Sequence, residues 1–146
     1  MKKKPINSVK IVFPSKSANE ALARSVAAAF TAQLDPTLEE LCDVKTAVSE
    51  AVTNAVVHAY PDSIGLIELT LRLFEGGVLS VTVKDKGCGI PDVELARTPT
   101  YTTGGDDRSG MGFTIMENFM GSLRIASRPG KGTTVTMRKV ITHGRG

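Results

Sequence analysis

The sequence contains no tryptophan, and aromatic residues make up only 5% of its 146 residues. Proteins that bind single-stranded nucleic acid without sequence preference stack bases on aromatic side chains, so this scarcity argues against such a surface. The formal net charge is only +3. It comes largely from the lysines at positions 2–4 and a basic C-terminus, and such segments more often increase solubility than bind nucleic acid. We therefore expect no direct contact with nucleic acid.

Cysteines and long apolar segments are also scarce. The two cysteines, Cys42 and Cys88, lie far apart and make neither a disulfide framework nor a metal-binding set, which suits a reducing compartment. No run of about 18 apolar residues is present, so we expect no membrane span. The lysines near the N-terminus precede an alternating polar and apolar stretch, whereas a signal peptide would continue with an apolar block. These features predict a cytoplasmic protein.

The length and composition are those of one ordinary globular domain. With 41% hydrophobic and 23% charged residues, the chain has enough apolar side chains for a core, and we expect residues 1–146 to form a single domain. A chain of this length buries roughly two thirds of its unfolded surface on folding. It therefore needs neither disulfides nor a structural metal.

The first half of the chain predicts one strand followed by two helices. Residues 8–13 alternate between polar and apolar, which is typical of a strand. Ser17 and Glu20 have the spacing of a capping box and predict a helix to about residue 34. Asp35 followed by Pro36 predicts the start of a second helix, with Asp35 as N-cap and Pro36 in the first helical position. This helix should end near Ala59, before Pro61.

The second half predicts two hairpins separated by a loop and a helix. Residues 67–73 and 79–84 alternate regularly on either side of Gly76-Gly77, which is typical of an antiparallel hairpin. Residues 91–110 have no clear period, so we expect a loop with at most one helical turn. A helix at 112–119 and a hairpin of 123–127 with 133–140 follow. The order predicts an α+β fold, a two-layer sandwich in which helices cover one face of a mostly antiparallel, mixed sheet.

Glu50 and Asn54 are the first candidate site residues. They are four residues apart on the second helix, so their side chains stack on one side, opposite the predicted core face of Val44, Val48 and Ala51. A solvated outer face explains most pairs of this kind. Ala47 and Val57 are predicted to share that side, however, and a face with small, apolar and convergent polar groups could form the floor of a pocket.

Three glycine-containing segments are the other candidates. Asp85 ends a strand and is followed by Gly87 and Gly89, which suits either a simple turn or a site where backbone approaches a flat ligand. Residues 108–113 enter a helix with two glycines, and free N–H groups there can hold phosphate. The segment matches neither the dinucleotide fingerprint, which needs glycine at Ile115, nor the P-loop. Residues 130–134 suit a hairpin turn, and on their own favour nothing more.

The four segments together, in this order, resemble the boxes of the ATPase superfamily that includes gyrase, a heat-shock chaperone, histidine kinases and a mismatch-repair protein. The resemblance covers almost the whole chain and implies a histidine-kinase-like ATPase fold with an ATP lid at about 91–110. Residues 47–55, 108–120 and 32–37 closely resemble the anti-sigma-F family of endospore-forming bacteria, which inhibits a sigma factor and is also a serine kinase. Residues 104–107 are shorter and richer in glycine than that family's lid.

The resemblance also implies roles for individual residues. Asp85 would accept a hydrogen bond from the adenine amino group, with Thr133 nearby; Asn54 would hold Mg²⁺; and Glu50 would act as the general base on the attacking serine. Arg24 would contact protein partners, unless it is only a solvated surface residue. The implied ATP-binding set is Asn54, Asp85, Gly87, Gly89, Ile90, Thr102, Thr103, Arg108, Ser109, Gly110, Met111, Gly112, Phe113 and Thr133.

The implied partners are a sporulation sigma factor of the sigma-F type and an anti-anti-sigma factor, with a homodimer as the implied assembly. Three alternatives remain open: an ATP-gated binding module without kinase activity, a general-stress anti-sigma kinase, and the catalytic domain of a histidine kinase. Against the last, His58 and His143 do not lie on a helix preceding the domain. We expect Cys88 to be a packing residue and His58 a surface residue.

Overall fold

A computed structural model describes residues 4–97 and 109–142 of the chain. The strands are β1 (Asn7–Pro14), β2 (Leu66–Phe74), β3 (Val78–Asp85), β4 (Ser122–Arg128) and β5 (Gly132–Val140). The helices are α1 (Ala18–Thr31), α2 (Leu38–Asn54), the single turn α3 (Val93–Ala96) and α4 (Ser109–Met120). Within the described residues, none of the helices is both long enough and apolar enough to cross a lipid bilayer.

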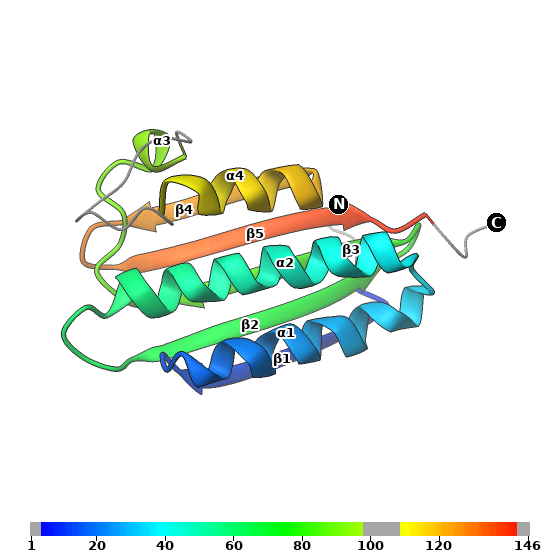
Figure 1. Cartoon of the computed structure of the whole chain (residues 1–146), viewed down its shortest axis with the longest axis horizontal. Coiled ribbons are helices and arrows are strands. Elements are labelled where there is room, and N and C mark those ends of the chain that lie inside the picture. Colours follow the sequence, from blue (N-terminus) through cyan, green and yellow to red (C-terminus); the bar gives the residue numbers. More distant parts are fainter. Residues whose placement is uncertain (1–3, 98–108, 143–146) are drawn as a thin grey trace.

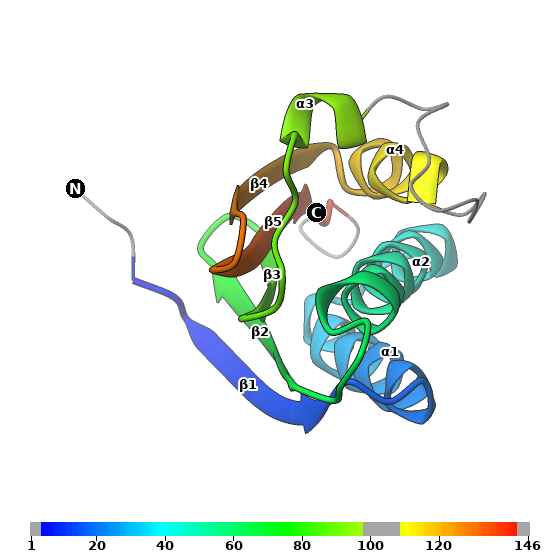
Figure 2. The ribbon, with the colours of Figure 1, turned by 90° about the vertical axis from the view of Figure 1, so that its left-hand side faces the viewer.

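The strands form one five-stranded sheet in the order β1-β2-β3-β5-β4. Every neighbouring pair is antiparallel. The prediction that the sheet is mostly antiparallel is therefore confirmed, but the prediction that it is mixed is wrong for the strands described here. Figure 1 shows α1, α2 and α4 side by side over this sheet, and Figure 2 shows that they all lie on the same face. The predicted two-layer α+β sandwich is therefore confirmed.

The core lies between the helices and the covered face of the sheet. Alternate residues of the predicted hairpin point into it, among them Ile67, Leu69, Leu71, Leu79 and Val81, each with no exposed surface. This alternation follows from the pleat of a strand, which turns successive side chains to opposite faces. The periodicity at 67–73 and 79–84 therefore predicted both the strands and their buried side.

The central helix α2 is buried over more of its surface than its sequence pattern indicates. Val44, Val48 and Ala51 lie in the core as predicted, but Ala47, which was placed on the opposite side, is also fully buried. The reason is that α2 packs against α1 on one side and α4 on the other. A helix with two helical neighbours needs a wider apolar stripe than one that contacts only a sheet.

The helix ends differ from the predictions at two points. Ser17 precedes α1 in a helical backbone conformation and makes no side-chain capping hydrogen bond. Asp35 is not an N-cap but the residue after a short 3₁₀ turn at Ala32–Leu34, with a left-handed φ of 50°. Beyond Asn54, α2 continues as one π-helical turn at Ala55–Ala59, so the helical segment ends at Ala59 as predicted.

The capping box forms at Thr37 instead. Thr37 Oγ1 accepts from the Glu40 backbone N–H at 3.0 Å, and Glu40 Oε1 accepts from the Thr37 N–H at 2.9 Å. Glu40 Oε2 also accepts from the Thr142 backbone N–H at 3.0 Å, beyond the end of β5. Thr37 can form the box because its backbone is extended, with ψ of 164°, so its side chain turns back toward the helix.

Substituting Thr37 by alanine should lower the free energy of unfolding by about 1 kcal/mol, because the N–H of Glu40 loses its acceptor. Ser17→Ala is the matched control, since Ser17 also precedes a helix but caps nothing. It should change stability by less than about 0.5 kcal/mol. Urea denaturation of both variants measures the difference; equal losses would contradict the assignment of the box to Thr37.

Candidate functional site

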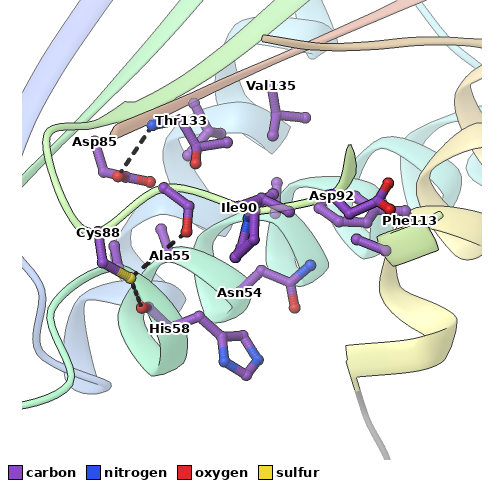
Figure 3. A pocket seen from close by; sticks show the side chains of 16 residues that line it. Asn54, Ala55, His58, Asp85, Cys88, Ile90, Asp92, Phe113, Thr133 and Val135 are labelled. Carbon is purple, nitrogen blue, oxygen red and sulfur yellow. Dashed lines mark hydrogen bonds between the residues drawn. The ribbon is translucent and has the colours of Figure 1, made fainter. Parts of the chain in front are cut away.

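A cavity of about 280 Å³ opens where the C-terminal end of α2 faces the ends of β3 and β5. Figure 3 shows its lining, which combines small apolar side chains with a few polar ones. The lining residues are Ala51, Asn54, Ala55, His58, Ala59, Val83, Asp85, Cys88, Gly89, Ile90, Pro91, Asp92, Ala96, Phe113, Thr133 and Val135. They come from segments that are far apart in the sequence.

Six of the predicted ATP-binding residues line this cavity: Asn54, Asp85, Gly89, Ile90, Phe113 and Thr133. The sheet register brings two of them together, because Asp85 at the end of β3 is paired with Thr133 near the start of β5. The helix α2 contributes Asn54 from the other wall. The four separate sequence segments thus meet around one space.

Asp85 is the most constrained polar residue of the cavity. It is only 7% exposed, and its Oδ1 accepts from the backbone N–H of Gly87 at 2.9 Å and of Thr133 at 3.3 Å. Burial raises the pKa of the Asp85 carboxyl above its ordinary value, and these two hydrogen bonds lower it in part. Among the described residues, Oδ2 has no hydrogen-bond partner, which leaves an acceptor for a ligand.

A network of hydroxyl groups lies behind Thr133. Thr133 Oγ1 and Ser127 Oγ are 2.8 Å apart. Ser127 Oγ also accepts from the Ile90 backbone N–H at 2.8 Å and donates to the Gly132 carbonyl at 3.1 Å. The network joins the hairpin of β4 and β5 to the segment after β3. Sequence reasoning missed Ser127, since a serine in an edge strand has no distinguishing pattern.

The two glycines after Asp85 allow the chain to pass close to its neighbours. A side chain on Gly87 would collide with the Ala59 carbonyl, and Gly89 has a φ of +78° that only glycine adopts readily. In this tight passage the backbone N–H of Cys88 donates to the Ala59 carbonyl at 2.9 Å. The glycine box therefore attaches the end of β3 to the end of the α2 helix.

Asn54 and Glu50 occupy different positions relative to the cavity. Asn54 lines it and also lies next to the first turn of α4, where a Cβ on Gly112 would be 2.9 Å from Asn54 Nδ2. Glu50 lies one turn earlier on α2, is partly buried, and is not among the lining residues. The amide therefore reaches the cavity, whereas the carboxylate lies beside it toward the N-terminus of α2.

Several predicted residues fall outside the described residues or outside the cavity lining. Thr102, Thr103 and Arg108 fall outside the described residues, as does most of the predicted lid. Ser109, Gly110 and Met111 form the first turn of α4. Within the segment predicted as a lid, the single turn α3 is followed by Arg97, whose Nη2 lies 3.0 Å from Glu117 Oε2 on α4.

Arg24 lies on α1, on the side of α2 away from α4 (Figure 2), and no residue of α1 is among those that line the cavity. Its Nε is 3.6 Å from Glu20 Oε2, and its side chain is 43% exposed. The structure thus leaves Arg24 at the surface, away from the cavity. That position agrees with either of the two roles considered for it.

One prediction about a residue near the cavity was wrong, because Cys88 is exposed rather than a packing residue. His58, predicted as a surface residue, is partly exposed and also lines the cavity. Cys88 Sγ donates to the His58 carbonyl at 3.1 Å. The spacing of His58, four residues after Asn54, could have indicated that the two share a side of the helix.

The raised pKa of Asp85 predicts a pH dependence of stability. Because the folded carboxyl holds its proton more tightly than the unfolded one, the free energy of unfolding falls as pH rises through the raised pKa. Asp85→Asn keeps an Oδ1 acceptor and does not titrate, so it should escape this loss. In urea denaturation without nucleotide, from about pH 4 to pH 8, the variant should gain stability relative to wild type. A constant difference would contradict the prediction.

A family model described as the histidine kinase-like ATPase domain matches residues 13–139. The anti-sigma F factor of Caldanaerobacter subterraneus subsp. tengcongensis is 51% identical over 140 residues, which covers 95% of this chain and 97% of that protein. The anti-sigma F factor of Geobacillus kaustophilus is 50% identical over 141 residues, covering 95% and 96%.

Solved structures agree on the fold. The structure of the RsbU and RsbW domains of a Mycobacterium tuberculosis protein matches with a TM-score of 0.68 at 20% identity, over 94% of this chain and 32% of that one. The histidine kinase domain of a blue-light activated kinase from Erythrobacter litoralis matches with a TM-score of 0.58 at 24% identity, over 84% and 61%. The chain therefore belongs to the histidine kinase-like ATPase domains and, among them, to the anti-sigma F factor family.

Proposed function

We propose that this anti-sigma factor binds ATP with Mg²⁺ in the cavity and uses it as a protein-serine kinase. In this proposal it holds a sporulation sigma factor of the sigma-F type, and it phosphorylates a serine of an anti-anti-sigma factor. The observation that carries the proposal is the joint presence of Asp85 and Asn54 in one cavity of an ATPase-family domain.

The Asp85 end of the cavity suits the adenine base. Asp85 is a buried residue, and its Oδ2 has no hydrogen-bond partner among the described residues, so an exocyclic amino group would supply a donor. Thr133 lies beside it. The neighbouring walls of Val83, Val135, Ala55 and Ile90 are apolar, as expected for the faces of a flat ring system.

The Asn54 end suits the phosphates. Asn54 lies next to Gly112 in the first turn of α4, and the N-terminus of a helix attracts anions through its free N–H groups. Asn54 would hold Mg²⁺ at this end, because an amide oxygen is a hard ligand that suits this cation. When bound, the ion would neutralise part of the phosphate charge.

In the proposal, Glu50 acts on the attacking serine. It precedes Asn54 by four residues on α2, so a group that approaches the phosphate end from the N-terminal side of the helix passes near its carboxylate. In the proposed transfer, Glu50 accepts the proton of the serine hydroxyl. The serine oxygen forms a bond to the γ-phosphorus, the bond from that phosphorus to the β–γ bridging oxygen breaks, and ADP leaves.

The protein partners of the proposal rest on the relatives, which are named anti-sigma F factors. We infer that the exposed side of α1 with Arg24 is part of the partner-binding surface. We further propose a homodimer that acts in the cytoplasm.

Asp85→Asn should weaken ATP binding by about ten- to a hundredfold, because the base would lose a hydrogen bond to a charged acceptor. Isothermal titration calorimetry at neutral pH measures the change. Asp62→Asn, which removes the same charge from an exposed turn, is the control and should bind as wild type. An unchanged affinity in Asp85→Asn would remove the base-binding role.

Glu50→Gln should reduce phosphate transfer to the anti-anti-sigma factor by at least about a hundredfold, since general-base catalysis contributes on that scale. ATP affinity should be retained, because Glu50 does not line the cavity. Glu39→Gln removes an exposed carboxylate from the same helix and should transfer normally. Labelled ATP measures the rate; a wild-type protein that binds ATP but labels no serine would favour the binding module without kinase activity.

A further inference from the structure

Tyr60 joins three parts of the chain but is not among the residues that line the cavity. It directly follows the π-helical turn Ala55–Ala59 and is partly buried. Its ring lies against Gly65, where any added side chain would collide with it. The hydroxyl donates to the Leu66 carbonyl at 2.8 Å and accepts from the Lys86 backbone N–H at 2.9 Å. The phenol thus uses both its donor and its acceptor to connect the helix end with β2 and with the segment after β3.

The two backbone groups that Tyr60 connects lie where the ladder between β2 and β3 would otherwise continue. The last pair of this ladder is Ile67 with Asp85. One step further in the same register, Lys86 would face Leu66, a position at which antiparallel strands can bond directly. The phenol oxygen lies between the Lys86 N–H and the Leu66 carbonyl instead. The tyrosine therefore ends the ladder at Asp85 while both backbone groups keep a hydrogen-bond partner.

Three consecutive backbone N–H groups after β3 donate to acceptors outside the sheet ladder. The first, of Lys86, donates to the Tyr60 hydroxyl, and the second, of Gly87, donates to Asp85 Oδ1 at 2.9 Å. The third, of the residue after Gly87, donates at 2.9 Å to the carbonyl of the residue before Tyr60. The end of the helix thus supplies acceptors on both sides of Gly87, and the place of the Gly87 N–H depends on these two flanking hydrogen bonds.

We propose that Tyr60 is a positioning residue for the base end of the nucleotide site. Its hydroxyl holds the backbone of Lys86 off the ladder, so that the next N–H, that of Gly87, turns back onto Asp85 Oδ1. With Oδ1 occupied in this way, Oδ2 is left for the ligand. The inference rests on the proposed nucleotide site, and Tyr60 acts through Asp85 because it does not itself line the cavity.

Tyr60→Phe tests the inference, since it keeps the ring and removes only the hydroxyl. The Lys86 N–H and the Leu66 carbonyl can then pair with each other, which extends the ladder and draws Gly87 away from Asp85. In the protein without nucleotide, the Gly87 N–H should exchange with solvent at least about tenfold faster, while the amides of β2 exchange as before. By calorimetry, ADP with Mg²⁺ and adenosine should both bind about tenfold more weakly, because both carry the base.

Ser15→Ala is the matched control. Ser15 is 8% exposed, and its Oγ accepts from the Gly65 N–H at 3.1 Å, so this hydroxyl holds the same end of β2 without touching Lys86. Both variants should lower the urea midpoint, but Ser15→Ala should leave the Gly87 exchange and the ADP affinity unchanged. An equal loss of ADP affinity in the two variants would mean that Tyr60 contributes only to stability, and would overturn the inference.

A double-mutant cycle tests whether Tyr60 acts through Asp85. In the Asp85→Asn background, Tyr60→Phe should change the ADP affinity by less than about twofold, because the carboxyl that it positions is already gone. If the two losses are fully additive, Tyr60 acts by another route and the inference is wrong.

Unchanged Gly87 exchange or unchanged ADP affinity in Tyr60→Phe would likewise overturn the inference. Failure of the proposed function looks different, because wild type would then bind no ADP while the Gly87 exchange still responds to the loss of the hydroxyl. If Tyr60→Phe does not fold, Tyr60→4-aminophenylalanine replaces it in every comparison. Its nitrogen still donates to the Leu66 carbonyl but accepts poorly from the Lys86 N–H, so the same losses are expected.

Discussion

The carboxyl group of Asp85 holds together the part of the molecule on which the cavity depends. Its Oδ1 accepts from the Gly87 N–H in the segment after β3 and from the N–H of Thr133, 48 positions after Asp85, so a single oxygen joins these two parts of the chain. Burial makes the ionised carboxyl costly, and the two N–H groups offset only part of that cost. The ionised Asp85 carboxyl is therefore unfavourable in the protein without a ligand. Such a group is expected at a binding site, where the ligand supplies a further hydrogen-bond donor.

The helix α2 serves the core and the cavity at the same time. Its buried stripe of Val44, Val48 and Val52 is fixed between the sheet and two neighbouring helices, so the amide of Asn54 sits on a support that cannot rotate. The same helix is anchored at both ends, by the Thr37 capping box and by the hydrogen bonds from Cys88. Rigid support of this kind is what a binding site requires, since small displacements of a contact group weaken it.

Much of the architecture follows from local patterns, but the helix ends do not. The alternation at 67–73 and 79–84 predicts strands because one sheet face is buried, and that is what the structure shows. Ser17-x-x-Glu20 and Thr37-x-x-Glu40 match the same capping pattern, yet only the second forms it. The difference lies in the backbone conformation of the first residue, which is helical at Ser17 and extended at Thr37. That conformation depends on the direction in which the chain leaves the preceding strand or turn.

The residues of the cavity also divide into those that a local sequence pattern predicts and those that it does not. Asn54, Asp85 and Thr133 belong to recognisable spacings, whereas Ser127 and Cys88 matter only because the sheet and the glycine box bring them to particular neighbours. Their roles depend on tertiary contacts that no short window of sequence contains. Ala47 was assigned to the wrong side for a related reason, since the burial of a helix face depends on the number of its neighbours.

The strand order has a consequence for synthesis on the ribosome. The strand β3 pairs with β2, which precedes it, and with β5, which is made last. Until the final hairpin emerges, one edge of β3 stays unpaired and presents the open row of N–H and C=O groups that promotes wrong association. Thr133 and Val135 arrive with that hairpin. Nascent chains consequently have no complete cavity, so a ligand of this cavity cannot stabilise the chain before the last strand docks.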